Sequence, residues 1–123
     1  MNRWIRIAEI VLGLIFLGAG LNGYAVLLGF EAFAPTVPAA MEFLGDGYLL
    51  ALEKGIEIFA GLLLVIRKFV PFALILLASL VVNILAFHLF VETEMLLLAI
   101  VVTALEVVLL WYYRDNFKGL LKK

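Results

Sequence analysis

Cysteine is absent from this 123-residue chain. Its absence excludes a disulfide, a thiolate nucleophile and a cysteine-ligated zinc or iron–sulfur site within the chain. Charged residues are also few, at 15% of the chain against about 25% in an ordinary soluble domain. Because the formal net charge is −1 and the basic residues do not gather on one binding face, we expect no nucleic-acid partner. We also predict no metal site.

Hydrophobic residues are in large excess. They make up 67% of the chain, where about 45–50% is typical of a soluble domain. A chain this short cannot bury so much apolar surface in one core, because small folds leave much of their surface exposed. The composition therefore argues against a soluble monomer and against intrinsic disorder, and it indicates a protein of the lipid bilayer.

Four hydrophobic segments are each about long enough to cross a membrane, since a spanning helix needs about 20 mostly apolar residues. They cover residues 7–28, 48–66, 72–91 and 95–113. The connections after the second and third segments are short, so those neighbours must pack antiparallel. We therefore predict an all-α fold, in which one integral-membrane antiparallel four-helix bundle fills the whole chain, residues 1–123.

The connection between the first two segments is the only long one. Pro35 and Pro38 interrupt it, and Thr36 can cap a short helix at about 37–44. Such a helix would lie at the interface between lipid and water on the outer side of the membrane. It would serve either as an amphipathic connector or as a lid over an outward-facing pocket.

Basic residues divide unevenly between the two ends of these segments. Eight of the nine Lys and Arg residues lie before the first segment, between the second and third, or after the fourth: Arg3, Arg6, Arg67, Lys68, Arg114, Lys118, Lys122 and Lys123. The other two connections carry acidic residues and neither Lys nor Arg. The positive-inside rule then places both termini in the cytoplasm, with the chain in the inner (plasma) membrane. The lysine-rich tail is expected to lie on the inner surface.

Several polar residues fall inside the segments, where a charge at the bilayer centre costs about 2.5–3.5 kcal/mol on insertion scales. Such groups must pair, take up a proton or line a cavity. At about 1.5 Å of rise per residue, five of them share the outer half of the membrane: Asn22, Lys54, Glu57, Asn83 and His88. Lys54 and Glu57 also lie on one helical stripe.

The outer polar group has two interpretations. In the first, Lys54 and Glu57 form a structural ion pair, Asn22 and Asn83 bond neighbouring helices, and His88 sits among lipid headgroups. In the second, all five bind a ligand in a pocket that opens outward. Asn83 and His88 are five residues apart, so both can face one pocket only if it is wide or the helix is distorted.

Two further acidic residues fall toward the inner half of the membrane. Glu9 is one turn from Arg6, which predicts a local ion pair. Glu106 has no basic residue nearby in the sequence.

The order of these residues resembles the DoxX-like family of small bacterial four-helix membrane proteins. The resemblance covers nearly the whole chain and rests on Gly18-Ala19-Gly20-Leu21-Asn22-Gly23, Gly47-Tyr48, Lys54-x-x-Glu57-x-x-x-Gly61 and Val82-Asn83-Ile84 with Phe87-His88. It implies a bacterial membrane protein associated with oxidoreductase systems, including quinone-linked thiosulfate oxidation and oxidative-stress complexes.

Three functions are compatible with these residues. The first is a membrane subunit of a redox system that binds a quinone or another lipophilic ligand, with Lys54, Asn83 and His88 as donors to its carbonyl oxygens and Glu57 as a proton relay. A soluble oxidoreductase would be its partner. The second is a small proton-coupled transporter. The third is a scaffold or assembly subunit, in which the polar groups hold the helices together. The small residues Ala19 and Gly23 favour a homo-oligomer.

Overall fold

The computed structural model describes residues 3–30, 48–90, 93 and 96–121. Regular structure in this part of the chain is entirely helical, with elements α1 (Arg3–Leu27), α3 (Tyr48–Ile66), α4 (Val70–Phe90), α5 (Leu96–Tyr112) and the 3-10 helix η1 (Arg114–Leu121). The four predicted helices are confirmed. The short helix expected at 37–44 lies outside the described residues.

The helix ends differ from the prediction mainly at α1. It begins at Arg3 rather than at residue 7, because two arginines limit an apolar segment but do not interrupt a helix. By contrast, α3 matches its predicted ends at 48 and 66. Pro71 is the second residue of α4, within the first turn, where its missing N–H costs nothing.

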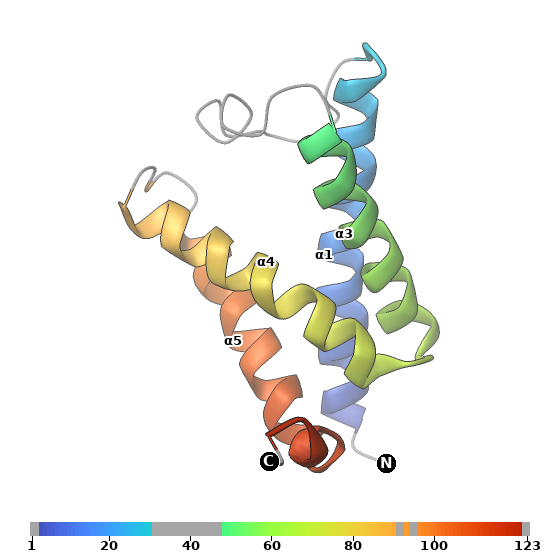
Figure 1. Cartoon of the computed structure of the whole chain (residues 1–123), viewed down its shortest axis with the longest axis vertical. Helices are drawn as coiled ribbons and strands as arrows, with labels where there is room; N and C mark the ends of the chain where they lie inside the picture. Colours follow the sequence, from blue (N-terminus) through green and yellow to red (C-terminus); the bar gives the residue numbers. More distant parts are fainter. Residues whose placement is uncertain (1–2, 31–47, 91–92, 94–95, 122–123) are drawn as a thin grey trace.

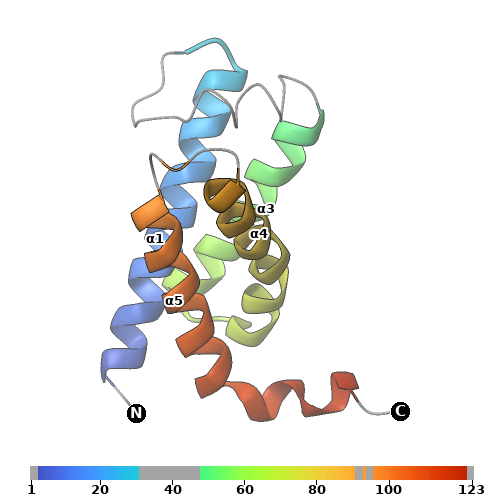
Figure 2. The same cartoon turned by 90° about the vertical axis from the view of Figure 1, so that its left-hand side faces the viewer.

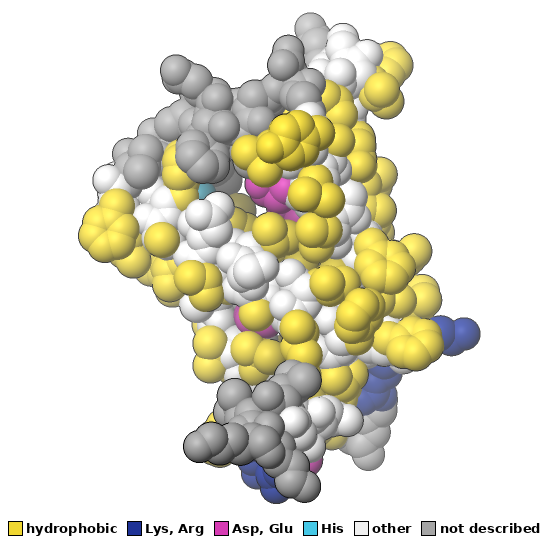
Figure 3. Space-filling view, viewed as in Figure 1, with side chains coloured by type: hydrophobic (Ala, Val, Ile, Leu, Met, Phe, Trp, Pro, Cys, Tyr) yellow, Lys and Arg dark blue, Asp and Glu magenta, His cyan; other side chains and the backbone are white. Residues whose placement is uncertain are grey.

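Two of the helices, α1 and α4, are long and apolar enough to span a membrane, and α5 is a shorter apolar helix. Large apolar side chains lie exposed on every long helix, among them Leu52, Val82 and Leu97 at 58%, 68% and 77%. Apolar side chains (yellow) accordingly cover much of the face drawn in Figure 3.

The helices form two pairs that meet at one end. Helix α1 lies along α3, and α4 packs on α5 (Figure 1). The two pairs converge where α3 turns into α4, and they diverge toward the opposite end. Both chain termini lie at the convergent end (Figures 1 and 2). The basic residues in the first turns of α1, after α3 and after α5 are therefore gathered at the same end of the molecule.

Glycines bring α1 and α3 into close contact. A Cβ atom built on Gly13 would lie 2.8 Å from the carbonyl oxygen of Gly61, and one on Gly61 would lie 2.8 Å from that of Gly13. Farther along, Gly23 faces the side chain of Lys54. The small-residue face at Ala19 and Gly23 was expected to support self-association, but at Gly23 it packs against α3 of the same chain.

We predict opposite effects for alanine at two α1 glycines. Gly13→Ala should lower the free energy of unfolding by about 1–3 kcal/mol, because the new methyl group meets backbone that cannot move aside without separating α1 from α3. Gly18→Ala is the matched control, since its Cβ would enter open space. It should be neutral or raise stability by up to about 1 kcal/mol. Unfolding in mixed micelles, followed by circular dichroism, measures both. Equal losses would contradict the close contact.

The C-terminal helix η1 leaves α5 at a steep angle (Figure 2). The side chain of Phe117 is half-buried and packs against the core. Lys118 Nζ lies 3.0 Å from Asp115 Oδ1, and its hydrogen bond holds the pKa of that carboxyl group below its usual range. A helix that turns away from the axis of α5 in this way is compatible with the expectation that the tail lies on the inner membrane surface.

Candidate functional site

The turn between α3 and α4 is built without glycine. The N–H of Arg67 donates to the Leu64 carbonyl at 3.3 Å, and that of Lys68 donates to the Leu63 carbonyl at 3.0 Å, which is the Schellman pattern at a helix C-terminus. Arg67 and Phe69 have φ values of 58° and 53°, a region that glycine normally occupies. A non-glycine residue there costs about 1–2 kcal/mol. The contacts of the Arg67 side chain with Glu9 and Tyr113 offset this cost.

Arg6 of α1 binds the same end of α3. Its Nη1 donates to the Leu64 carbonyl at 2.9 Å, and its Nη2 donates to the Val65 carbonyl. These carbonyls belong to the last turn of α3, where the helix dipole is negative. The guanidinium therefore caps α3 and fixes α1 against it.

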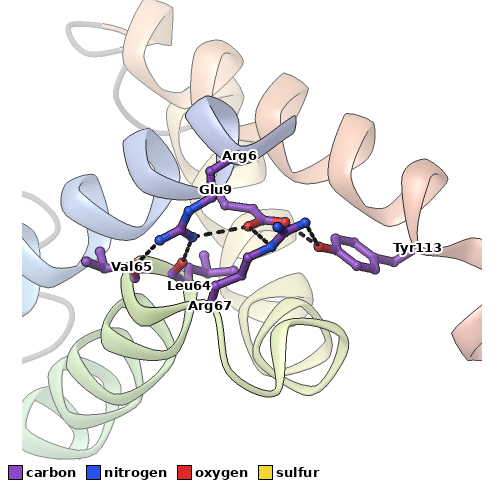
Figure 4. Close-up of polar contacts among 6 residues, drawn as sticks. All are labelled: Arg6, Glu9, Leu64, Val65, Arg67 and Tyr113. Carbon is purple, nitrogen blue, oxygen red and sulfur yellow. Dashed lines mark hydrogen bonds and ion pairs between the residues drawn. The ribbon is translucent and has the colours of Figure 1, made fainter. Parts of the chain in front are cut away.

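Glu9 of α1 contacts residues that follow α3 and α5, and so connects three helices at this end of the molecule (Figure 4). Its side chain is fully buried, with Oε1 at 3.3 Å from Arg6 Nη1 and 3.1 Å from Arg67 Nε. The hydroxyl of Tyr113 donates to Oε2. The predicted pair with Arg6 is confirmed. Arg67 and Tyr113 were not predicted, although Arg67 directly follows the predicted segment 48–66 and Tyr113 is the last residue of the predicted segment 95–113. We call these four residues, Arg6, Glu9, Arg67 and Tyr113, the Glu9 cluster.

A second polar group lies farther up α3. Lys54 Nζ is 3.3 Å from Glu57 Oε2 and 3.7 Å from Glu53 Oε1. The side chain of Glu57 is 3% exposed, whereas those of Lys54 and Glu53 are 14% and 15% exposed. We call Glu53, Lys54 and Glu57 the Lys54 triad. Two carboxylates thus share one ammonium, on a side chain that is partly exposed.

The Lys54 triad lies against α1. A Cβ atom on Gly23 would come within 2.5–2.7 Å of the Lys54 Cγ, Cδ and Cε atoms, so glycine at this position leaves room for the lysine stem. One residue away, Tyr24 donates its hydroxyl proton to the Ala51 carbonyl at 2.8 Å. Asn22, also expected at the site, is buried on this stretch of α1 and has a polar contact of its own.

Asn83 and His88 of α4, which were expected to line one pocket, lie on different sides of the helix. His88 is half-buried, and its ring centroid lies 5.5 Å from that of Phe87. It shares a helical stripe with the buried residues Leu77 and Val81, which face the other helices. Asn83 is exposed. A five-residue step turns about 140° around a helix, so Asn83 lies on the other side of α4 and does not join the Lys54 triad.

The Lys54 triad borders a hollow. Acidic side chains (magenta) come into view beside α3, where the surface sinks between α3 and α4 (Figure 3). This is the end at which the two helix pairs diverge (Figure 1). Among the described residues, no group of three or more His, Asp and Glu side chains is placed to hold a metal ion.

Glu106 of α5 is also buried, but unlike Glu9 and Glu57 it forms no ion pair within the described part of the chain. It is 2% exposed, and neither carboxylate oxygen has a hydrogen-bond partner in the described part of the chain. It lies on the same stripe of α5 as the core residues Val102 and Leu109. A buried polar group without a partner costs about 1–3 kcal/mol.

We therefore predict that Glu106→Leu raises the free energy of unfolding by about 1–3 kcal/mol, since leucine keeps the volume and removes the cost of burying the carboxyl group. Glu106→Ala is the control for volume and should be less stable than Glu106→Leu, because it leaves a cavity. Chemical unfolding in micelles compares them. A loss of stability in Glu106→Leu with none in Glu106→Gln would instead show that a polar partner acts on this residue.

Comparison with protein-family models, with curated proteins and with solved structures finds no match to this chain.

Proposed function

We propose that the chain is an integral membrane protein in which α1, α3, α4 and α5 cross the bilayer, with both termini in the cytoplasm. Three features support this proposal. Two of the helices have the length and hydropathy of membrane spans. Large apolar side chains are exposed on all four. Basic residues flank the end at which both termini lie, and cytoplasmic loops carry such an excess.

The function that this arrangement supports best is binding of a lipophilic molecule through a polar head group at the Lys54 triad. The observation that carries it is the Lys54 ammonium between two carboxylates, on a side chain that is 14% exposed, in the triad whose acidic side chains border the hollow between α3 and α4. A quinone suits such a site, because its carbonyl oxygens accept hydrogen bonds from an ammonium and its ring and tail are apolar. His88, on the inward stripe of α4, is a second donor toward the same end of the bundle. In this proposal the protein is the DoxX-like membrane subunit of a redox system, and a soluble oxidoreductase is its partner.

A proton-coupled transporter is the second candidate, and the charge of the Lys54 triad favours it. Two carboxylates share one ammonium, so one negative charge in the triad lacks a counter-charge when both are ionised. In an apolar surrounding such a charge must take up a proton or a cation. Glu57 is the more buried of the two acids and hence the candidate proton carrier.

Mass spectrometry of small molecules that co-purify with the protein in native lipid tests the first candidate. A quinone retained by the wild type and lost from the Lys54→Met, Glu57→Leu variant would support it. Lys118→Met is the control, because Lys118 is exposed and distant from the hollow along the chain. Proton-driven uptake by vesicles, without a retained quinone, would instead support the transporter. A folded protein with neither property would contradict both candidates and leave the scaffold role.

A further inference from the structure

An uncharged polar side chain is exposed on the outer side of α4. Asn83 lies seven residues before the end of this helix, about 10 Å from its outer end at 1.5 Å per residue. If α4 spans the bilayer, as proposed above, this side chain faces lipid at hydrocarbon depth. Within the described part of the chain, the Asn83 carboxamide has no hydrogen-bond partner. Lipid offers it none at that depth.

Its neighbours on this side of the helix are uncharged. We define the α4 outer face by the exposed residues Phe72, Ile75, Ser79, Val82 and Asn83. A serine hydroxyl can bond a carbonyl of its own helix, so Ser79 needs no outside partner. A carboxamide has two donors and an acceptor, so Asn83 needs one.

A second copy of the same face supplies what the carboxamide needs. Because it both donates and accepts, two carboxamides related by a two-fold axis satisfy each other, as an isologous interface requires. All copies in a membrane have the same orientation, so the axis runs along the membrane normal. Helix α4 runs obliquely to α1 (Figure 1), and two such helices cross at a short contact. The small side chain of Ser79, one turn from Asn83, lets the backbones approach there.

We propose that the protein forms a homodimer through the α4 outer face, with Asn83 of each copy hydrogen-bonded across the two-fold axis. This face is distinct from the glycine-rich side of α1, which is filled by α3 at Gly13 and Gly23. The proposal depends on membrane insertion and does not depend on what the Lys54 triad binds.

Disulfide crosslinking tests the location of the interface, on a chain that has no cysteine of its own. Val82→Cys in native membranes at low expression should give a crosslinked dimer. Ala104→Cys is the matched control, because Ala104 is exposed on α5 at the same distance from the outer helix end, about 12 Å. It should stay monomeric. Crosslinking at Ala104 and none at Val82 would overturn the proposal.

Dimer affinity in vesicles tests the role of the carboxamide. Asn83→Leu should weaken association about three- to twentyfold, the range measured for interhelical hydrogen bonds in membranes. Asn83→Gln retains the carboxamide and should weaken it less. Resistance to carbonate extraction checks membrane insertion in the same samples. A wild type that stays inserted but monomeric, or a dimer indifferent to Asn83→Leu, would overturn this proposal and leave the proposed ligand site standing.

Discussion

Replacing Glu9 by leucine is expected to lower the free energy of unfolding by about 3–5 kcal/mol. Glu9 is fully buried and binds two guanidinium groups and one phenol. Its loss leaves the charges of Arg6 and Arg67 together at the convergent end of the bundle, with side chains only 27% and 28% exposed. Removing one partner of a buried ion pair costs this much because the remaining charge is uncompensated. The tryptophans at this end, Trp4 and Trp111, give a fluorescence signal for the unfolding measurement.

Two control variants separate charge from backbone. Lys118→Met breaks an exposed ion pair with Asp115 and should cost less than about 1 kcal/mol. Arg67→Gly also removes an arginine from Glu9, but glycine relieves the left-handed backbone, so its loss should be smaller than that of Glu9→Leu. A Glu9→Leu protein as stable as the Lys118→Met protein would show that the Glu9 cluster does not hold the helices together.

The Lys54 triad should respond differently in stability and in binding. Lys54→Met alone should cost about 3–5 kcal/mol, because Glu57 then stays buried without its ammonium or must take up a proton. The double variant Lys54→Met, Glu57→Leu should be about as stable as the wild type or more so, since well-packed apolar residues often equal a buried ion pair. Both variants should lose the ligand, because both lose the ammonium.

Thermal unfolding and quinone binding, measured side by side on these variants, test the Lys54 triad as a site. Glu53→Gln is the milder comparison, because Glu53 is partly exposed and lies farther from the ammonium, at 3.7 Å. A stable double variant that keeps full binding would show that the pair has a structural role only.

The sequence predicted the helices well because α3, α4 and α5 each begin and end within two residues of a charged residue, whereas the start of α1 was missed because Arg3 and Arg6 lie within the helix. It could not predict how the helices meet. Glu9 and Tyr113 are 104 residues apart, and no periodicity within one helix relates them. The same limit applies to Gly23, where a small residue indicates close packing but not whether the neighbour is α3 or another copy.

The candidate site could be predicted only as a group of residues at one depth. Depth along a helix follows from counting residues, so Lys54, Glu57 and Asn83 were grouped by level. The side of the helix is a separate coordinate, and at 100° per residue Asn83 turns away from His88. The contact of Lys54 with Glu57 follows from their spacing on one helix and is observed at 3.3 Å.

Cysteine labelling in intact cells tests most directly whether the four helices cross a membrane with both termini inside. Thr93 precedes α5 at one end of the bundle, and Lys118 follows α5 at the other; both are exposed. The chain has no native cysteine, so a membrane-impermeant maleimide reports only the introduced residue. We expect Thr93→Cys to be labelled from outside and Lys118→Cys only after permeabilisation. Labelling of Lys118→Cys in intact cells, or of neither residue before lysis, would contradict the account.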